Sequence, residues 1–324
     1  MNEMKELKLV VMDGVWTEWL DDYEAVSDRV KAVAATTEKM LLAEVKNADI
    51  VFGRLPREPF LAAQKLKWVQ SIGVGFETML YTEMVESDVV ITNTAGAFDV
   101  AMAEHVLALI LSWTRGVITA ERNRSIRYYT RDISVSEIAG RRACVLGLGT
   151  IGRKISSHLH GIGMRITAVD AQVAVPPECV EELVKPDRLY EVLGKSEFLI
   201  VALPLTDGTR GLVDKKCFEA MPPHAYVVNI ARGGIINERD LIKALQLGKI
   251  AGAGIDVYEE EPLPEDNPLW SIDNAVITPH LAGLSSEGHE NMRKILCENL
   301  HRYTNGEALM NVVDKKRGYV IQSV

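Results

Sequence analysis

Short apolar segments alternate with amphipathic segments along most of the chain. Five apolar runs have the length and the β-branched content of buried strands, and they lie at residues 8–12, 31–35, 49–53, 67–73 and 89–93. Between them, residues 38–47 and 58–65 have the pattern of amphipathic helices. Strands that alternate with helices predict βαβ units and a parallel sheet.

A second series of the same kind follows a long helix and a polar stretch. Residues 99–115 ("DVAMAEHVLALILSWTR") predict a long helix, and the arginine-rich residues 121–132 predict a connector without a strand. Six further strand candidates follow, at "ACVLGLG", "RITAVD", "FLIVAL", "AYVVNI", "IAGAGIDV" and "NAVITP". This second series predicts a second parallel sheet.

The last long helix candidate covers residues 285–306. Its apolar positions recur at helical spacing, at Met292, Ile295, Leu296, Leu300 and Tyr303, and the Asn-Gly pair at its end is a stop signal. Because two long helices bracket the second series, we expect one α/β domain to be inserted into another. Residues 1–100 and 285–324 would form one domain, and residues 101–284 the other.

Composition and charge narrow the class of protein. The chain has 324 residues, of which 47% are hydrophobic and 25% charged, as is usual for globular chains of about two domains. Its net charge is −9, whereas a protein that binds the phosphates of a nucleic acid needs a basic face. We therefore expect no nucleic-acid partner, and an anionic substrate would need positive charge placed locally.

The cysteines give no sign of a disulfide framework or a metal site. Cys144, Cys179, Cys217 and Cys297 lack C-x-x-C spacing, and three of them lie among apolar residues. The N-terminal sequence shows no basic stretch before a long apolar region, and no apolar run reaches the roughly 18 residues of a membrane span. We expect a cytoplasmic chain with no membrane partner and no bound metal.

The first strand candidate of the second series leads into the motif Gly147-x-Gly149-x-x-Gly152, and a helix candidate follows it. In that setting the first glycine permits a tight turn, the second lets the backbone approach a pyrophosphate, and the third allows close packing of helix on strand. The phosphates would lie at the helix N-terminus, beside Thr150 and Ile151. The motif therefore predicts a dinucleotide, although glycines at this spacing also occur in turns that bind nothing.

The next strand candidate ends in Asp170, about 20 residues further on, where dinucleotide-binding domains carry an acidic residue. A carboxylate there accepts hydrogen bonds from the adenosine ribose and repels a 2′-phosphate. The residues that follow, Ala171, Gln172 and Val173, include no lysine or arginine. We therefore expect NAD(H) to be preferred over NADP(H).

Three polar side chains follow strand candidates of the second series, namely Arg232, Glu261 and His280. In open α/β sheets ligands bind outside the carboxyl ends of the strands, where the glycine motif also opens. An arginine can hold a carboxylate bidentately, a histidine can transfer a proton, and a glutamate can stabilise the imidazolium. With NADH these groups suit reduction of a 2-oxo acid, although each alone also fits a surface or loop residue without a role.

The chain resembles the D-isomer-specific 2-hydroxyacid dehydrogenase family. The motifs that carry the resemblance are "VLGLGTIGR", "LPLTDGTRGLVD", "MPPHAYVVNIARGGIINERDLIKALQLGKIAGAGIDVYEEEPLPEDNPLW" and "ITPHLAG". The match as a whole covers nearly the whole chain and is strongest over residues 140–314, where "ENLHRYTNGEALMNVVD" closes it. The resemblance implies an α/β fold of two Rossmann- or flavodoxin-like domains with parallel sheets, in which the NAD-binding domain is inserted into the substrate-binding (catalytic) domain.

The resemblance also implies roles for single residues. Arg232 matches the substrate-binding arginine, His280 the catalytic histidine, and Glu261 the acid paired with that histidine. Asp256 matches the aspartate near the nicotinamide carboxamide. The other matched positions are Leu203 and Pro204 on the adenine side, Ala231 in the cofactor site, and Gly73, Val74 and Gly75, whose backbone N–H groups hold the substrate carboxylate in the family.

The glycine loop at Gly73 departs from the family pattern in Glu77, where an aspartate or asparagine is more usual. Phe76 beside it either narrows the substrate pocket or packs against its own domain. Arg54 either touches a substrate or lies on the surface. These positions leave the identity of the substrate open.

The function expected from the resemblance is NAD(H)-dependent reduction of a small 2-oxo acid such as glyoxylate or hydroxypyruvate. Phosphoglycerate oxidation is an alternative, but chains of that activity often carry a C-terminal regulatory domain and this sequence ends at Val324. An NAD-sensing corepressor is another, although no extension or peptide-docking segment is evident. A homodimer is expected, with residues 99–115 and the connector as candidate interface segments, unless that helix faces its own core.

Overall fold

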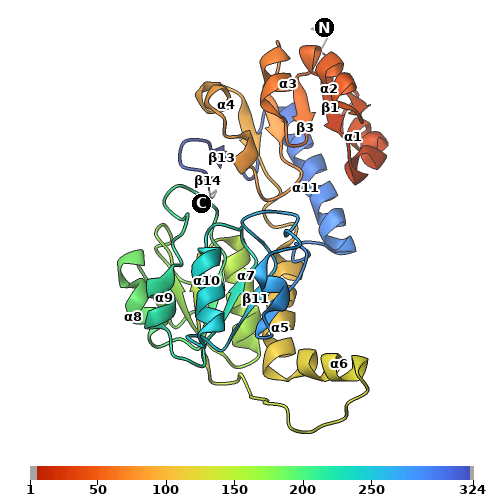
Figure 1. The fold of residues 1–324 in the computed structure, drawn as a ribbon. Coiled ribbons are helices and arrows are strands. Elements are labelled where there is room, and N and C mark those ends of the chain that lie inside the picture. Colours follow the sequence, from red (N-terminus) through yellow and green to blue (C-terminus); the bar gives the residue numbers. More distant parts are fainter. Residues whose placement is uncertain (1–5, 322–324) are drawn as a thin grey trace. The chain divides into compact units, whose positions relative to one another are not determined.

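The structure, a computed structural model, describes residues 6–321. The described residues divide into two compact units: residues 6–97 and 285–321 form unit 1, and residues 98–284 form unit 2. The first boundary lies at Phe98 rather than at the expected residue 101. Figure 1 shows the last helix, α11 (Ser286–Asn305), beside the strands from the beginning of the chain.

Unit 1 is built on a five-stranded parallel sheet with the order β2-β1-β3-β4-β5, the order of flavodoxin-like sheets. Its strands are β1 (Leu7–Met12), β2 (Val30–Ala35), β3 (Ile50–Phe52), β4 (Trp68–Gln70) and β5 (Val90–Thr92). Each corresponds to one of the predicted apolar runs. The central strands β3 and β4 are fully buried, as expected for a parallel sheet covered on both faces.

The helices of unit 1 are α1 (Leu20–Ala25), α2 (Glu38–Glu44), α3 (Arg57–Ala62), α4 (Thr82–Glu86) and α11, with 3-10 helices η1 (Val15–Trp19), η2 (Val45–Asn47) and η3 (Glu77–Met79). The sequence pattern does not predict α1, α4, η1 or η3, because segments this short show no full helical period, whereas η2 lies within the helix predicted at residues 38–47. A small antiparallel pair, β13 (Val313–Asp314) and β14 (Tyr319–Val320), follows α11.

Helix α11 has clear start and stop signals, and it packs on the sheet of unit 1. Ser285 caps it by accepting the N–H of Gly288, and Gly306 ends it in the left-handed conformation with φ 72°. Its buried Asn299 donates to Gln70 on β4 (2.9 Å), and Tyr303 stacks on Trp68. These contacts make the C-terminal helix part of the same core as the N-terminal strands.

Unit 2 contains a seven-stranded parallel sheet with the order β12-β11-β10-β9-β6-β7-β8. Its strands are β6 (Arg142–Leu146), β7 (Arg165–Val169), β8 (Glu182–Val184), β9 (Phe198–Val201), β10 (Tyr226–Asn229), β11 (Gly252–Ile255) and β12 (Ala275–Ile277). The strand order reverses between β6 and β9, as in doubly wound dinucleotide-binding folds, and ligands bind at such switch points. The predicted α/β class with parallel sheets is confirmed. Only β8 has no counterpart among the predicted strands.

Helices cover both faces of this sheet (Figure 1). They are α5 (Asp99–Thr114), α6 (Val117–Ser125), α7 (Thr150–Gly161), α8 (Leu189–Leu193), α9 (Lys215–Ala220) and α10 (Glu238–Gln246), with 3-10 helices η4 (Pro186–Arg188) and η5 (Pro268–Ser271). The apolar side of α5 is buried in the core that it shares with α7, so this helix faces its own core, which is the alternative to its use as an interface segment. Among the described residues no single helix is long and apolar enough to cross a membrane; α5 and α6 meet that test only as a pair bent by 66°.

The expected connector at residues 121–132 contains no strand, as predicted, and its first residues belong to a helix that the prediction does not include. Helix α6 runs to Ser125 and starts after Gly116, which turns the chain with φ 66°. Its Glu121 and Arg124 form an ion pair one turn apart. The segment is too polar to show an apolar stripe, which is why periodicity does not find this helix.

Candidate active site

The glycine motif forms the turn between β6 and α7. A β-carbon at Gly147, where φ is 100°, would lie 2.6 Å from the Ala202 carbonyl oxygen, and one at Gly152 would lie 2.0 Å from the Gly147 oxygen. These two positions therefore require glycine for close packing. A β-carbon at Gly149 would meet no atom of the described residues within 4 Å, so the backbone there is open to a ligand.

The N-terminus of α7 fits a dinucleotide pyrophosphate. Gly149 precedes this 12-residue helix and has no side chain to cap its first N–H groups, which leaves them available to an anion. Thr150 and Ile151 form the first turn, where the Thr150 hydroxyl bonds Asp99 (3.4 Å). Leu203, which precedes Pro204 after β9, would contact a β-carbon at Gly147 at 3.0 Å, so this segment borders the glycine turn.

Asp170 ends β7 beside the same turn, and its carboxylate holds the backbone on both sides. One oxygen accepts the N–H of Leu148 within the glycine motif (2.7 Å), and the other accepts the N–H groups of Gln172 and Val173. The Lys185 ammonium donates to the carbonyl of Ala171 (2.9 Å). The sequence analysis missed this cation, because Lys185 reaches the turn only through the pairing of β8 with β7.

His280 and Glu261 are in direct contact. The Nδ1 atom of His280 lies 2.7 Å from one Glu261 carboxylate oxygen, and the other oxygen accepts the N–H of Tyr258 (3.0 Å). The His280 side chain is 49% exposed. The Glu261 carboxylate thus fixes one face of the imidazole, and a proton on Nδ1 would be shared with it, which leaves Nε2 for other partners.

Arg232 lies in the loop after β10, and the backbone around it is held firmly. Asn229 donates to the Arg232 carbonyl (3.1 Å) and accepts the N–H of the buried Ala231. A β-carbon at the next residue, Gly233, would lie 1.7 Å from the Tyr258 carbonyl oxygen. The loop that carries Arg232 therefore packs directly on the loop that carries Glu261.

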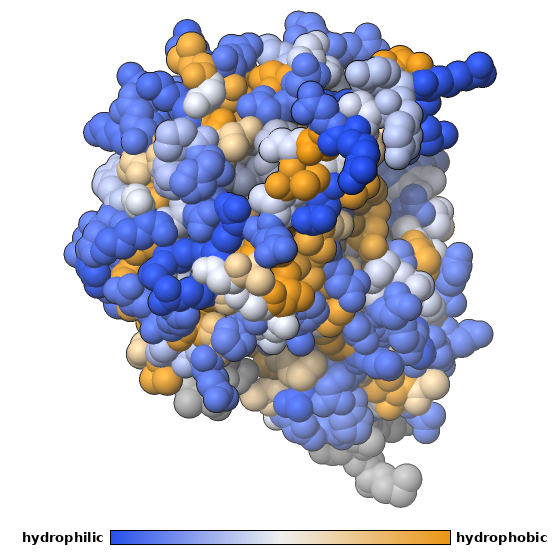
Figure 2. Space-filling model, turned by 90° about the horizontal axis from the view of Figure 1, so that it is seen from below, coloured by the Kyte–Doolittle hydropathy of each residue, from blue (hydrophilic) through white to orange (hydrophobic). Residues whose placement is uncertain are grey.

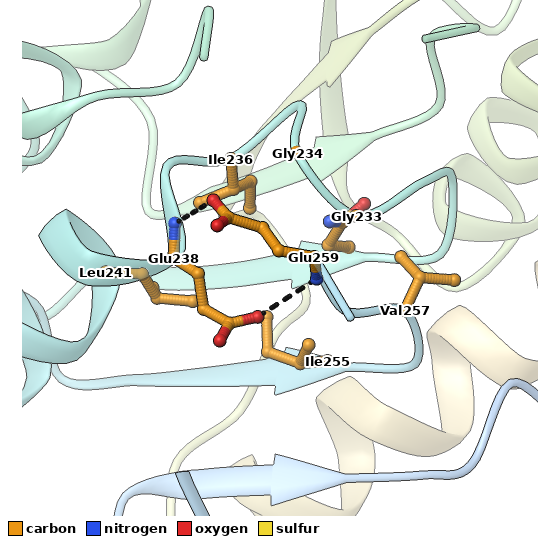
Figure 3. A pocket seen from close by; sticks show the side chains of 9 residues that line it. Gly233, Gly234, Ile236, Glu238, Leu241, Ile255, Val257 and Glu259 are labelled. Carbon is orange, nitrogen blue, oxygen red and sulfur yellow. Dashed lines mark hydrogen bonds between the residues drawn. The ribbon is translucent and has the colours of Figure 1, made fainter. Parts of the chain in front are cut away.

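Two glutamates, Glu238 and Glu259, link the loop after β11 to the start of α10 by hydrogen bonds (Figure 3). Glu238 at the start of α10 donates its N–H to the Glu259 carboxylate (3.0 Å), and the N–H of Glu259 donates to the Glu238 carboxylate (3.2 Å). Asn267 donates to the second oxygen of Glu238. Glu238 and Glu259 are thus structural partners rather than free surface charges.

Asp256, which follows β11, is fully buried below His280. Its carboxylate accepts hydrogen bonds from the amides of Leu281 and Ala282 and from the Thr278 hydroxyl. Burial raises the pKa of this carboxyl, but these bonds and the nearby ring of His105 outweigh it, so the pKa lies below its ordinary value. Asp256 therefore stabilises the backbone of the loop that carries His280.

In unit 1, the loop Gly73, Val74 and Gly75 turns its carbonyl groups toward its own unit. They accept from the Thr94 amide (3.4 Å), the Asn93 side chain (2.7 Å) and the Ser71 hydroxyl (3.0 Å), respectively. Within residues 6–321 no acceptor is recorded for the three N–H groups of the loop. Successive backbone N–H groups without an acceptor in the protein are the kind of donors that an anion-binding nest uses.

The neighbours of this loop settle one of the open alternatives. Phe76 is only 5% exposed and belongs to the core of unit 1, so it packs against its own domain. Arg54 is exposed, and its guanidinium lies beside the loop, because a β-carbon at Gly73 would be 3.0 Å from Nη2. A cation therefore stands next to the proposed nest.

The strand order of unit 2 and its glycine turn together define a doubly wound, dinucleotide-binding class of protein. Residues 107–282 match the family model for the NAD binding domain of D-isomer specific 2-hydroxyacid dehydrogenases. A glyoxylate reductase from Pyrococcus furiosus is 33% identical, with 85% of each chain covered, and one from Korarchaeum cryptofilum is 31% identical, with 89% of this chain and 90% of the relative covered. The chain belongs to the D-isomer specific 2-hydroxyacid dehydrogenase family.

Two further relatives are a longer protein and a solved structure that holds NADPH. A D-3-phosphoglycerate dehydrogenase from Methanocaldococcus jannaschii is 31% identical over 95% of this chain, and the chain spans 59% of that relative. A solved D-isomer specific 2-hydroxyacid dehydrogenase from Xanthobacter autotrophicus, in complex with NADPH and MES, has a TM-score of 0.85 and 29% identity, with 97% of this chain and 100% of that chain covered.

Proposed function

We propose that the chain is an NAD(H)-dependent 2-hydroxyacid dehydrogenase that reduces a small 2-oxo acid such as glyoxylate or hydroxypyruvate. The observation that carries the proposal is the 2.7 Å contact between His280 Nδ1 and Glu261, which leaves Nε2 able to exchange a proton. Family membership and the open glycine turn at Gly149 support the cofactor part. Asp170 supports NAD(H) over NADP(H).

In this proposal each side chain has a separate task. Arg232 binds the substrate carboxylate as a bidentate partner. In unit 1, the N–H groups of Gly73, Val74 and Gly75 are assigned to anion binding. When bound, NADH supplies a hydride to the carbonyl carbon. His280 gives its Nε2 proton to the carbonyl oxygen as the C=O π bond opens, and Glu261 keeps the ring oriented and its charge compensated. In the reverse direction His280 takes the hydroxyl proton.

A panel of 2-oxo acids, tested with NADH and NADPH, addresses the proposal directly. We expect NADH oxidation with at least one of them, and His280→Ala should lower kcat by about 10² to 10⁴, the usual contribution of a positioned acid–base group. His224→Ala is the matched control, because His224 also faces a glutamate, Glu197, but at 3.6 Å on the surface. Normal turnover by His280→Ala would refute the assignment.

Phosphoglycerate oxidation is a second candidate, and two observations favour testing it. The relative from Methanocaldococcus jannaschii carries that name, and the Arg54 guanidinium lies beside Gly73, where it could meet a second anionic group. D-3-phosphoglycerate with NAD⁺ should therefore be part of the panel. Turnover that is lost on Arg54→Ala, while glyoxylate reduction persists, would favour this candidate.

We further propose that the chain acts in the cytoplasm as a homodimer. The support for a dimer is a group of exposed apolar side chains at and after α6, namely Val117, Ile126, Tyr128, Tyr129 and Val135. Figure 2 views the molecule from the side on which α6 lies in Figure 1 and shows apolar groups among the polar ones. Light scattering at micromolar concentration should give twice the chain mass, and Tyr129→Glu should shift it toward that of one chain.

A further inference from the structure

The backbone of His280 is held in an unfavourable conformation. Its φ is +55°, in the left-handed region, which is sterically unfavourable for a residue with a side chain. A strained residue persists only where its surroundings fix it, and such residues often occur at functional sites. The groups that fix His280 are therefore of direct interest for the proposed reaction.

Three successive amides after Pro279 converge on one residue. The N–H of His280 donates to the Asp256 carbonyl (2.9 Å), while those of Leu281 and Ala282 donate to its two carboxylate oxygens (2.8 Å each). The left-handed turn at His280 is what lets these amides point the same way. The orientation of His280 thus depends on where the Asp256 carboxylate lies.

The Asp256 carboxylate is held in turn by a chain of hydrogen bonds from helix α5. The Thr278 hydroxyl donates its only proton to Asp256 at 2.5 Å, so it can only accept from His105, whose Nε2 lies 3.0 Å away. The same Nε2 is 3.5 Å from the Asp256 carboxylate. The geometry therefore requires the tautomer of His105 that carries its proton on Nε2.

We propose that His105 is a positioning residue for His280, acting through Thr278 and Asp256. This role rests on the proposed function for its catalytic meaning, but the structural linkage itself can be tested without turnover. His105 does not touch the proposed reacting atoms; it fixes the carboxylate that sets the backbone of the His280 loop. Without its donated proton, Thr278 and Asp256 can rotate, and the His280 ring loses its fixed direction.

The first test measures the His280 ring in the protein without added ligands. Nitrogen and proton resonances of the ring, assigned by their loss in His280→Gln, should shift in His105→Leu and in Thr278→Val. His105→Gln should restore them, because an amide can donate the same hydrogen bond. His158→Leu is the matched control, since His158 is a half-buried ring of unit 2 whose Nδ1 bonds a carbonyl of its own helix, that of Lys154.

The second test is kinetic. His105→Leu and Thr278→Val should each lower kcat for the best 2-oxo acid about tenfold, with KM nearly unchanged, as expected for one lost hydrogen bond to a charged network. If His105 and Thr278 act through the same series of hydrogen bonds, kcat of the double variant should fall no further than kcat of either single variant. His105→Gln should recover most of the turnover.

The outcomes separate this inference from the proposed function. Unchanged His280 resonances in a folded His105→Leu protein would overturn the positioning role, and additive losses in the double variant would do the same. Where His105→Leu does not fold, Thr278→Val decides, because it removes only the linking hydroxyl. If His280→Ala keeps its turnover, the proposed function fails, and the resonances still decide whether His105 sets the ring.

Discussion

Gly233 packs so closely on Tyr258 that a β-carbon would overlap the Tyr258 carbonyl oxygen, at 1.7 Å. The obstacle is backbone rather than a flexible side chain, so it can be relieved only by moving one of the two loops that carry Arg232 and Glu261. The distance between these loops is therefore fixed by the absence of one methyl group.

Gly233→Ala should consequently lower both stability and turnover. We expect a loss of about 1–3 kcal/mol in unfolding free energy, as for other overpacked positions, and a fall in kcat/KM for the 2-oxo acid. Gly161→Ala is the control, because Gly161 ends α7 and a β-carbon there meets no described atom within 4 Å. A Gly233→Ala protein with normal melting and normal kinetics would contradict the close approach.

Asn93→Ala should weaken the binding of the substrate carboxylate. The Asn93 side chain holds the Val74 carbonyl and accepts the N–H of Ala95, so its loss lets the loop at Gly73 rotate its amides away. We expect KM for the 2-oxo acid to rise about tenfold while the dissociation constant of NADH is unchanged. Asn237→Ala is the control. It removes the side-chain cap of α10, which should lower the unfolding free energy by about 1 kcal/mol, and it should leave KM for the 2-oxo acid unchanged.

Asp170→Asn should reduce the preference for NADH. The variant keeps the size of the side chain but removes the charge that repels a 2′-phosphate, and Lys185 at the same turn is a cation that such a phosphate could approach. The ratio of kcat/KM for NADH to that for NADPH should fall by about tenfold or more, while Asp187→Asn in the exposed helix η4 should not change it. A wild-type protein that uses NADPH better than NADH would show that the ribose argument is wrong.

Asp256 should make the protein sensitive to acid. Because its pKa is lower in the folded chain than in the unfolded one, its charged form stabilises the fold above about pH 4, and this contribution is lost as the pH falls through the folded pKa. The difference in thermal midpoint between the wild type and Asp256→Asn should therefore be largest near neutral pH and shrink below about pH 4. A difference that does not depend on pH would contradict the role of the charge.

The regular parts of the fold follow from the sequence pattern, and the short parts do not. Every strand of the unit 1 sheet coincides with a predicted apolar run, because the inner strands are buried on both faces and the edge strands β2 and β5 still bury part of their residues. Helix α6 and strand β8 escape prediction, since the apolar residues of α6 are confined to its first four positions and β8 has only three residues. Their existence depends on what they pack against.

The same division holds for the candidate site. Residues that follow strands, such as Asp170 and His280, are visible in the sequence because parallel strands end at one edge of the sheet. Lys185 and His105 are not, because each reaches its partner through a neighbouring element rather than through its own strand. The sequence around Lys185 does not indicate that it binds the turn after Asp170, and the sequence around His105 does not indicate that it binds Thr278.

Unit 1 is built from the two ends of the chain, and this has a consequence for the order in which the protein can be made. Gln70 meets its partner Asn299 across 229 residues, and Trp68 stacks on Tyr303 of the same helix. During synthesis all of unit 2 leaves the ribosome before α11 exists, so it can fold first, as contiguous domains generally do. Until α11 is synthesised, Trp68 and Gln70 on the N-terminal strands lack the helix that covers them. These five strands are therefore the part of the nascent chain that a chaperone would have to shield.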